Sequence, residues 1–284
     1  MKETAYLLQA VLISAWGVGM ATHETFFLAF QFNEMPPAAF WAFFGPGLVL
    51  IASASFICSY RKLPALEYVI LAAFGIATLY CANASFRTAS GYLSTGLILM
   101  GLAYNAFACF NQSLFHTSSS SLRRNILKTS VQVICIWSLT LVIIPCVLLD
   151  AFDNLALPKL SIWQFVGFST FCCASLLGLT SSFFLVRDGA GTPLPLDQTN
   201  HLVMSGPYHF VRNPMAIAGI GQGISVAIIF QSIAILVYSV LGALVWQLVV
   251  RPIEENDLLT RFGKSYLDYR QRVSCWIPTF KFFR

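Results

Sequence analysis

The chain has 284 residues, of which 57% are apolar or aromatic and only 10% are charged, and its net charge is +5. Soluble domains carry about 25% charged residues, so this composition excludes an ordinary soluble fold. The basic residues form no stripe with interleaved aromatic residues, which argues against a nucleic-acid partner.

Long apolar runs follow one another along most of the chain. A helix needs about 20 apolar residues to cross the hydrocarbon core, and its backbone polar groups are satisfied within the segment. The runs predict an all-α, polytopic transmembrane protein with about eight spans. The expected spans cover residues 5–32, 38–60, 66–85, 91–114, 126–149, 161–186, 215–230 and 232–250. The last two spans meet at Phe230-Gln231-Ser232, so we expect them to form a tight helical hairpin.

Residues 1–160 contain no motif with recognisable chemistry, and we expect them to be a transmembrane scaffold of about five helices. The first run lacks a small-residue cleavage site, which favours a retained helix over a removed signal peptide. His23 and Glu24 are expected to lie at the membrane interface. The eight cysteines are scattered and show no CxxC or Cys/His spacing, so we expect no metal site.

Lysine and arginine decide the expected orientation, because cytoplasmic loops carry the positive excess. If the N-terminus lies in the cytoplasm, every basic residue except Arg87 and Lys159 falls on the cytoplasmic side. We therefore expect a multi-pass membrane protein with both termini in the cytoplasm. Its membrane would be the endoplasmic reticulum in a eukaryote or the inner membrane in a bacterium.

The composition changes at Arg187. Glycines and prolines between Arg187 and Asn213 forbid a continuous helix, and so long a connection inside a compact protein is usually functional. Pro214 then occupies the first turn of the next helix, where neighbouring N–H groups remain free. This helix start, with Arg212 beside it, favours an anionic or acceptor group.

A second polar cluster, Arg251-Pro252-Ile253-Glu254-Glu255, follows the last span. The antiparallel hairpin brings it next to Arg212, and together the clusters form a small zwitterionic site. The residues alone leave two interpretations open, a ligand site and a set of interfacial ion pairs. An amphipathic tail follows, in which Gly263 is expected to end the first helical half.

The C-terminal third resembles the isoprenylcysteine carboxyl methyltransferases and the related phospholipid methyltransferases. Several spaced elements occur in the order typical of that family. They are Leu202-Val203, Ser205-Gly206-Pro207-Tyr208, Arg212-Asn213-Pro214-Met215, Arg251-Pro252-Ile253-Glu254-Glu255, Phe262-Gly263, Tyr266, Tyr269, Val273 and Pro278.

This resemblance implies that residues 161–284 are the core of a methyltransferase that uses S-adenosyl-L-methionine. The cofactor-binding residues that it implies are His201, Leu202, Val203, Gly206, Tyr208, Arg212, Asn213, Pro214, Met215 and Glu254. Arg251 is the candidate for the family's substrate-associated arginine, and Glu255 is the nearest candidate base for a protonated amine. The family commonly has Arg-His-Pro where this chain has Arg-Asn-Pro, so Asn213 suits cofactor binding better than proton transfer.

The expected partners are membrane lipids and a lipidic or prenylated small substrate. One candidate acceptor is the carboxylate of a prenylated cysteine, and a phospholipid amine is the alternative. Nicotinamide-dependent sterol reductases share a similar pattern, but typically have Trp and Cys where this chain has Tyr266 and Arg270. A transporter would place charged residues near the bilayer midplane, whereas nearly all of them here lie at the cytoplasmic rim.

Overall fold

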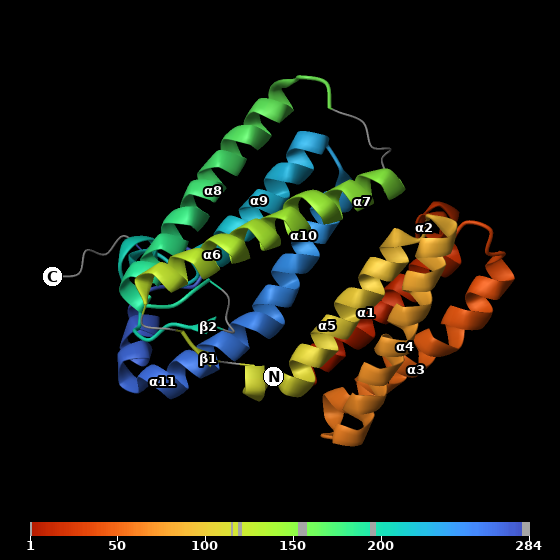
Figure 1. Cartoon of the computed structure of the whole chain (residues 1–284), viewed down its shortest axis with the longest axis horizontal. Helices are drawn as coiled ribbons and strands as arrows, with labels where there is room; N and C mark the ends of the chain where they lie inside the picture. Colours follow the sequence, from red (N-terminus) through yellow and green to blue (C-terminus); the bar gives the residue numbers. More distant parts are fainter. Residues whose placement is uncertain (1, 115, 119–120, 153–157, 194–196, 280–284) are drawn as a thin grey trace. The chain divides into compact units, whose positions relative to one another are not determined.

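The computed structural model describes residues 2–114, 116–118, 121–152, 158–193 and 197–279, and it is almost entirely helical. Among the described residues, seven helices are long and apolar enough to cross a membrane, and Pro214–Phe230 is a shorter apolar helix. The predicted polytopic helical membrane protein with about eight spans is confirmed. The chain forms two compact units, Met1–Leu114 and Phe115–Arg284 (Figure 1). The functional division predicted at residue 160 stays a prediction.

The first unit is a bundle of helices. It contains α1 (Lys2–Thr22), α2 (Glu24–Phe30), α3 (Pro37–Tyr60), α4 (Pro64–Thr88) and α5 (Tyr92–Leu114). The apolar run at 5–32 is not one helix, because the backbone is extended at His23 between α1 and α2. Inside the bundle, Gln9 donates to Ser55 over 2.8 Å, and Asn105 donates to Gln9 over 2.7 Å. These buried bonds join α1, α3 and α5, as polar side chains do between membrane helices.

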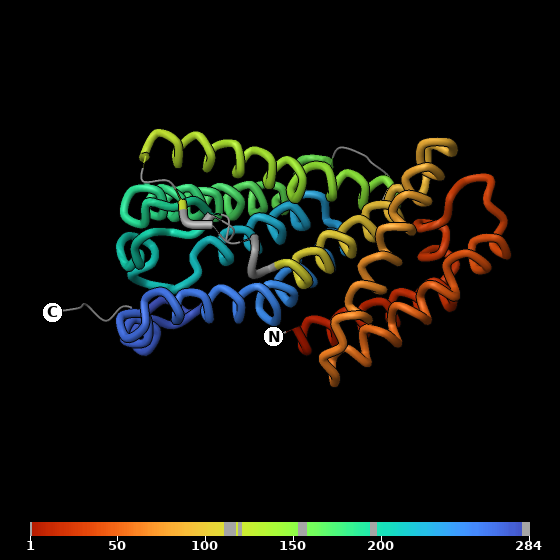
Figure 2. Tube along the Cα trace, turned by 60° about the horizontal axis from the view of Figure 1, so that its bottom comes forward, coloured from red at the N-terminus to blue at the C-terminus, as the bar shows by residue number. Residues whose placement is uncertain are grey.

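The second unit contains the remaining helices and one short strand pair. Its elements are β1 (His116–Thr117), α6 (Leu122–Trp137), η1 (Ser138–Ile143), α7 (Ile144–Phe152), α8 (Ile162–Gly189), β2 (Asp197–Gln198), η2 (Gly206–His209), α9 (Pro214–Phe230), α10 (Ile233–Val245), η3 (Trp246–Val250) and α11 (Arg251–Arg272). Both η1 and η3 are π-helical, whereas η2 is a 3-10 turn. Figure 2 shows α10 running through η3 directly into α11.

Helices α8 and α9 lie side by side (Figures 1 and 2). A capping box of Ser161 and Gln164 begins α8, and the Gln164 side-chain amide also donates to the Ile229 carbonyl over 2.8 Å. Gln231 then adopts a left-handed conformation, and the Ser232 hydroxyl caps α10 by accepting from the Ile235 N–H. This turn sets α9 and α10 antiparallel, so the start of α9 and the end of α10 lie at the same end of the unit.

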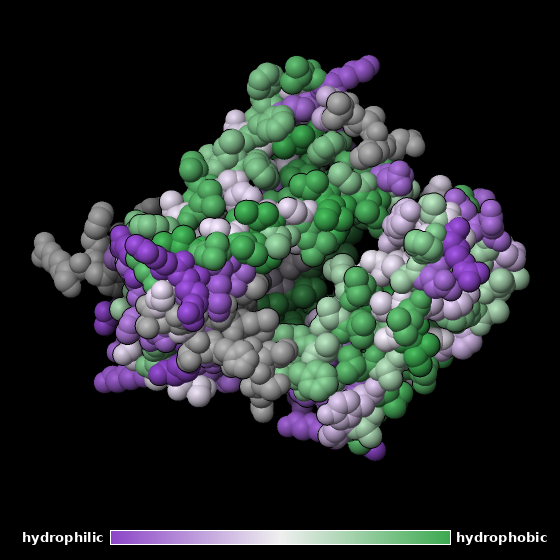
Figure 3. All heavy atoms as spheres, viewed as in Figure 1, coloured by the Kyte–Doolittle hydropathy of each residue, from purple (hydrophilic) through white to green (hydrophobic). Residues whose placement is uncertain are grey.

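The apolar segment Ile233–Val250 is followed without a break by the highly charged α11. On the face shown in Figure 3, hydrophilic side chains of the second unit gather over α11 and the start of α6. Within α11, Gly263 has φ 50° and ψ −122°, which breaks the helical path. The chain after this kink buries Tyr266 and Tyr269 in a cluster that includes Leu202. The kink therefore folds the tail back onto the connection between α8 and α9.

Replacing Gly263 with alanine tests this kink. The observed φ and ψ suit glycine, so the variant should lose about 1–3 kcal/mol of folding free energy. The measurement is thermal unfolding of purified protein in detergent. The control is Gly75→Ala, because Gly75 is helical and an added Cβ there meets nothing within 4 Å. A Gly263→Ala variant as stable as this control would contradict the assigned role of the kink.

Candidate functional site

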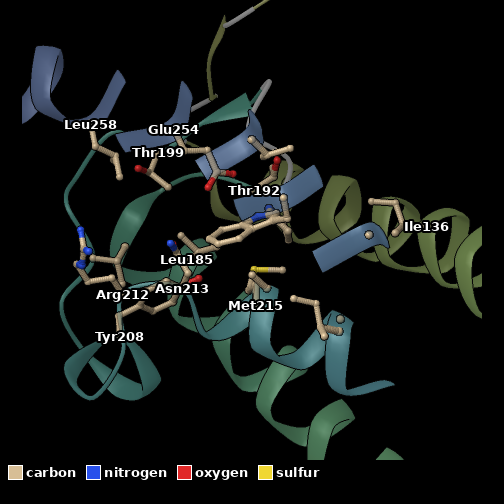
Figure 4. Close-up of a pocket in the computed structure, with 18 of the residues that line it drawn as sticks. Ile136, Leu185, Thr192, Thr199, Tyr208, Arg212, Asn213, Met215, Glu254 and Leu258 are labelled. Atoms are coloured by element: carbon tan, nitrogen blue, oxygen red, sulfur yellow. The ribbon is translucent and has the colours of Figure 1, made fainter. Parts of the chain in front are cut away.

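A cavity of about 510 Å³ lies in the second unit, at the end where α9 begins and α10 ends. Its walls come from α6, α9, α10 and α11 and from the connection between α8 and α9. Seven of the predicted cofactor residues line it, namely Leu202, Val203, Tyr208, Arg212, Asn213, Met215 and Glu254. The other three, His201, Gly206 and Pro214, do not line it, and neither do the two predicted catalytic residues, Arg251 and Glu255. The structure thus brings Tyr208 and Glu254, from opposite sides of the hairpin, to one cavity (Figure 4).

Backbone contacts hold the connection between α8 and α9 in place. Gly206 has φ 60°, and a Cβ there would lie 2.4 Å from the Phe184 ring, so glycine is required. The Tyr208 carbonyl accepts from the Tyr269 hydroxyl over 2.7 Å, which ties the connection to the tail. Pro214 is buried at the first position of α9. Gly206 and Pro214 therefore shape the cavity without lining it.

A second set of contacts, with residues outside the cavity wall, holds the Arg212 side chain in place. Its Nη1 donates to Glu255 Oε1 over 2.9 Å and to the Tyr266 hydroxyl over 3.3 Å. Arg251 Nε donates to the same Glu255 oxygen over 2.9 Å, and Arg270 lies 3.8 Å from the other. The arginines fully engage the Glu255 carboxylate. Arg212 Nε, in contrast, is buried and has no hydrogen-bond partner within the described chain.

Glu254 is in a different environment from its neighbour. In Figure 4 its carboxyl points into the cavity, and no hydrogen bond or ion pair is found for it within the described residues. Burial, followed by the negative charges of Glu255 and Asp257, raises the pKa of Glu254 from 4.5 to about 7. The Thr192 hydroxyl, also in the cavity wall, is buried without a partner. Unsatisfied buried polar atoms are rare in folded proteins, and two of them, Arg212 Nε and Thr192 Oγ1, belong to residues of this cavity wall.

A pair of residues on α11 that the sequence analysis missed forms one rim of the cavity. Asp257 and Arg261 form an ion pair of 2.6 Å. Asp257 accepts from the Gln198 side chain over 2.7 Å, and Arg261 donates to the Thr199 carbonyl over 2.6 Å. Their spacing from Glu254, one and two helical turns, was a usable signal. No comparable signal in the sequence indicated that α6, α10 and Thr192 contribute to the cavity wall.

The comparisons with known proteins agree with this location. A family model described as phospholipid methyltransferase matches residues 162–265. Over these residues the chain is similar to that family. The predicted resemblance is confirmed, and the match identifies a membrane methyltransferase domain that contains most of the cavity wall. No curated protein and no solved structure matches the chain. The methyltransferase domain excludes α6, which supplies another part of the wall, and most of the tail that supports Tyr208.

The two neighbouring glutamates should respond oppositely to conversion to glutamine. The pKa of folded Glu254 exceeds its ordinary value, so the folded state binds more protons and wild-type stability falls as pH rises from 4.5 to about 7. Glu254→Gln removes this loss and should be more stable than wild type at pH 8 by about 3 kcal/mol, with little difference at pH 4.5. Thermal unfolding at both pH values measures the effect.

Glu255→Gln is the matched variant. It leaves the three arginines without their carboxylate and should destabilise the protein by about 3 kcal/mol at pH 8. A destabilised Glu254→Gln variant together with an unaffected Glu255→Gln variant would reverse the assignment of the two side chains.

Proposed function

We propose that this protein is an integral-membrane methyltransferase that binds S-adenosyl-L-methionine in the cavity and methylates a lipidic acceptor. The observation that carries the proposal is the Glu254 carboxyl, which points into the cavity of a methyltransferase domain, together with two buried polar atoms of the wall that have no partner among the described residues, Arg212 Nε and Thr192 Oγ1. Each can bind a different part of a zwitterionic nucleotide.

The cavity residues fit this cofactor in size and chemistry. A volume of about 510 Å³ lies within the usual range of small-molecule sites, about 300–1,000 Å³. Glu254 can accept hydrogen bonds from an ammonium or from ribose hydroxyls, and Arg212 Nε can donate to a carboxylate. Tyr208 and Val203 supply apolar contacts. When bound, the cofactor supplies an electrophilic methyl group on a sulfonium, and the chain has to align the acceptor and exclude water.

The positions of the two glutamates divide their roles. Glu255 is engaged by arginines and lies outside the cavity wall, which supports a positioning role in which it fixes Arg212. Arg251 shares this carboxylate, so its action on a substrate stays a prediction. If the acceptor is an amine, it must lose a proton before it attacks. Glu255, which is engaged by arginines outside the cavity wall, is poorly situated to take that proton.

The acceptor and the orientation are finer parts of the proposal. The family match favours a phospholipid amine, and the carboxylate of a prenylated cysteine is the second candidate. The distribution of lysine and arginine supports a cytoplasmic position for the cavity's polar end and for both termini. The cofactor would then come from the cytoplasm and the acceptor from the membrane.

Cofactor binding should depend on pH through Glu254. The ionised carboxylate is the form that pairs with an ammonium, and with a pKa of about 7 its population rises as pH increases from 6 to 8. The affinity for S-adenosyl-L-methionine should therefore rise by up to about tenfold over this range, measured by titration calorimetry.

Variants of Glu254 test the assignment of this pH dependence. Glu254→Gln should bind more weakly at pH 8 and lose the dependence, and Glu254→Ala should bind more weakly still. The exposed Glu24→Gln variant is the control. Unchanged binding by both Glu254 variants would remove Glu254 from the site.

The chemical stability of transferred label identifies the acceptor. Purified protein is incubated with S-adenosyl-L-methionine labelled in its methyl group, together with phosphatidylethanolamine or farnesylcysteine. We expect base-stable label in phosphatidylethanolamine, as for methylation of nitrogen. Base-labile label in farnesylcysteine would instead assign a carboxyl ester. Label in neither substrate would contradict the proposed activity on these two lipid classes.

A further inference from the structure

The cavity has a second, apolar half that the proposed cofactor contacts do not use. Figure 4 shows Arg212 and Tyr208 at one side of the cavity and Ile136 at the other, with Met215 between them. The apolar half is lined by residues of α6, η1, α9 and α10, including Thr140 and Tyr238. Helix α6 and η1 lie outside residues 162–265, so the family match covers only the α9 and α10 side of this half.

Two glycines in the wall of the apolar half leave open space where other residues would place a side chain. Gly219 on α9 and Gly242 on α10 both line the cavity, and a Cβ at either position would meet nothing within 4 Å. Close helix packing requires glycine elsewhere in this unit. At Gly223, for example, a Cβ would lie 2.6 Å from the Ser239 hydroxyl. The open space means that helix packing does not require glycine at positions 219 and 242. Glycine is also less favourable than alanine in a helix interior, so helix stability does not explain these two residues either. Open space beside them is consistent with a ligand that needs the room.

Two π-helical turns border the same cavity. The first, η1, contributes Thr140 and Leu141, and the second, η3, contributes Trp246 and Val250. The Tyr238 hydroxyl donates to the Thr140 carbonyl over 3.4 Å, which joins α10 to η1 across the wall. Single π turns are frequent at functional sites because they redirect side chains within an otherwise regular helix. Leu141 also lines a second cavity of about 560 Å³, whose other walls are almost entirely apolar.

The depth of these residues in the membrane indicates which kind of ligand the cavity can bind. Tyr238 and Gly242 belong to the apolar segment Ile233–Val250, whereas Glu254 lies beyond its end. The apolar half therefore lies at the depth of the hydrocarbon core, and the polar half lies at the membrane surface. A ligand that fills the first and reaches the second must have a hydrocarbon chain and a polar head.

We infer that the apolar half of the cavity, between α6 with η1 on one side and α9 with α10 on the other, binds the hydrocarbon chain of the methyl acceptor. Gly219 and Gly242 set the width of this chain site. The inference rests on the proposed function for the identity of the chain as part of the acceptor. An acyl chain and an isoprenoid chain present the same chemistry to this wall, so the test includes both.

Photolabelling tests the chain site directly. The protein is placed in phosphatidylcholine nanodiscs that contain phosphatidylethanolamine with a diazirine on its acyl chain. A parallel sample contains farnesylcysteine with a diazirine on its isoprenoid. At least one probe should label Ile136, Thr140 and Tyr238 in the cavity, besides outward-facing residues such as Val240. Which probe labels the cavity assigns the source of the chain.

Leucine variants of the two bare glycines provide the decisive comparison. Gly242→Leu and Gly219→Leu should lose cavity labelling by about fivefold or more, because the new side chain fills the space, and should keep labelling at Val240. Gly242→Ala should show a smaller loss, which keeps the test valid if a leucine variant does not fold. Gly75→Leu, a helical glycine with open space in the first unit, should label like wild type.

Two results would overturn the chain site: wild-type labelling confined to outward-facing residues, or cavity labelling unchanged in folded Gly242→Leu. S-adenosyl-L-methionine binding is measured by calorimetry on the same preparations. Wild-type protein that labels inside the cavity but does not bind the nucleotide would contradict the proposed function and leave the chain site standing.

Discussion

The site depends on the different environments of two adjacent carboxylates. Glu254 and Glu255 follow each other on a helix and therefore point in directions about 100° apart. One is neutralised by three arginines, and the other enters a cavity without a partner. If Glu255 were also unpaired, two desolvated carboxylates would lie side by side and destabilise the folded state. If Glu254 were also paired with an arginine, the cavity would have no free carboxylate. The ion-pair cluster thus lets a desolvated carboxylate remain beside it.

The same cluster links the two segments that flank the helical hairpin. Arg212 precedes α9 and Glu255 follows α10, so their bond of 2.9 Å closes the open end of the hairpin. The tail strengthens this closure, because the Tyr269 hydroxyl bonds to the Tyr208 carbonyl and the Arg212 N–H bonds to the Ser274 carbonyl. The closed end gives the cavity a fixed polar half, while apolar residues of α6, η1, α9 and α10 give it an apolar half.

Much of this arrangement follows from the sequence. Apolar runs of membrane length predict the helices, and the short junction Phe230-Gln231-Ser232 between the last two runs predicts the hairpin that brings Tyr208 near Glu254. The facing of Glu254 and Glu255 could not be predicted, because the π turn η3 shifts the register just before them and α-helical periodicity does not reveal such a turn. The contribution of Thr140 on η1 was equally hidden, since it depends on long-range packing and on another π turn. Residues 5–32 were expected to form one span, but the extended backbone at His23 interrupts the helix there.

The return of the tail onto the loop before α9 has a consequence for the modular organisation of the chain. The boundaries of the family match, residues 162–265, cut through α11 just after its kink and exclude both Tyr269 and α6. A fragment trimmed to those boundaries would keep most of the side chains that line the cavity. It would lose the Tyr269 hydroxyl, which donates to the Tyr208 carbonyl, and the side of the cavity formed by α6. The smallest piece able to preserve this architecture therefore extends in both directions beyond the homologous segment, from the start of α6 to the residues that follow Tyr269.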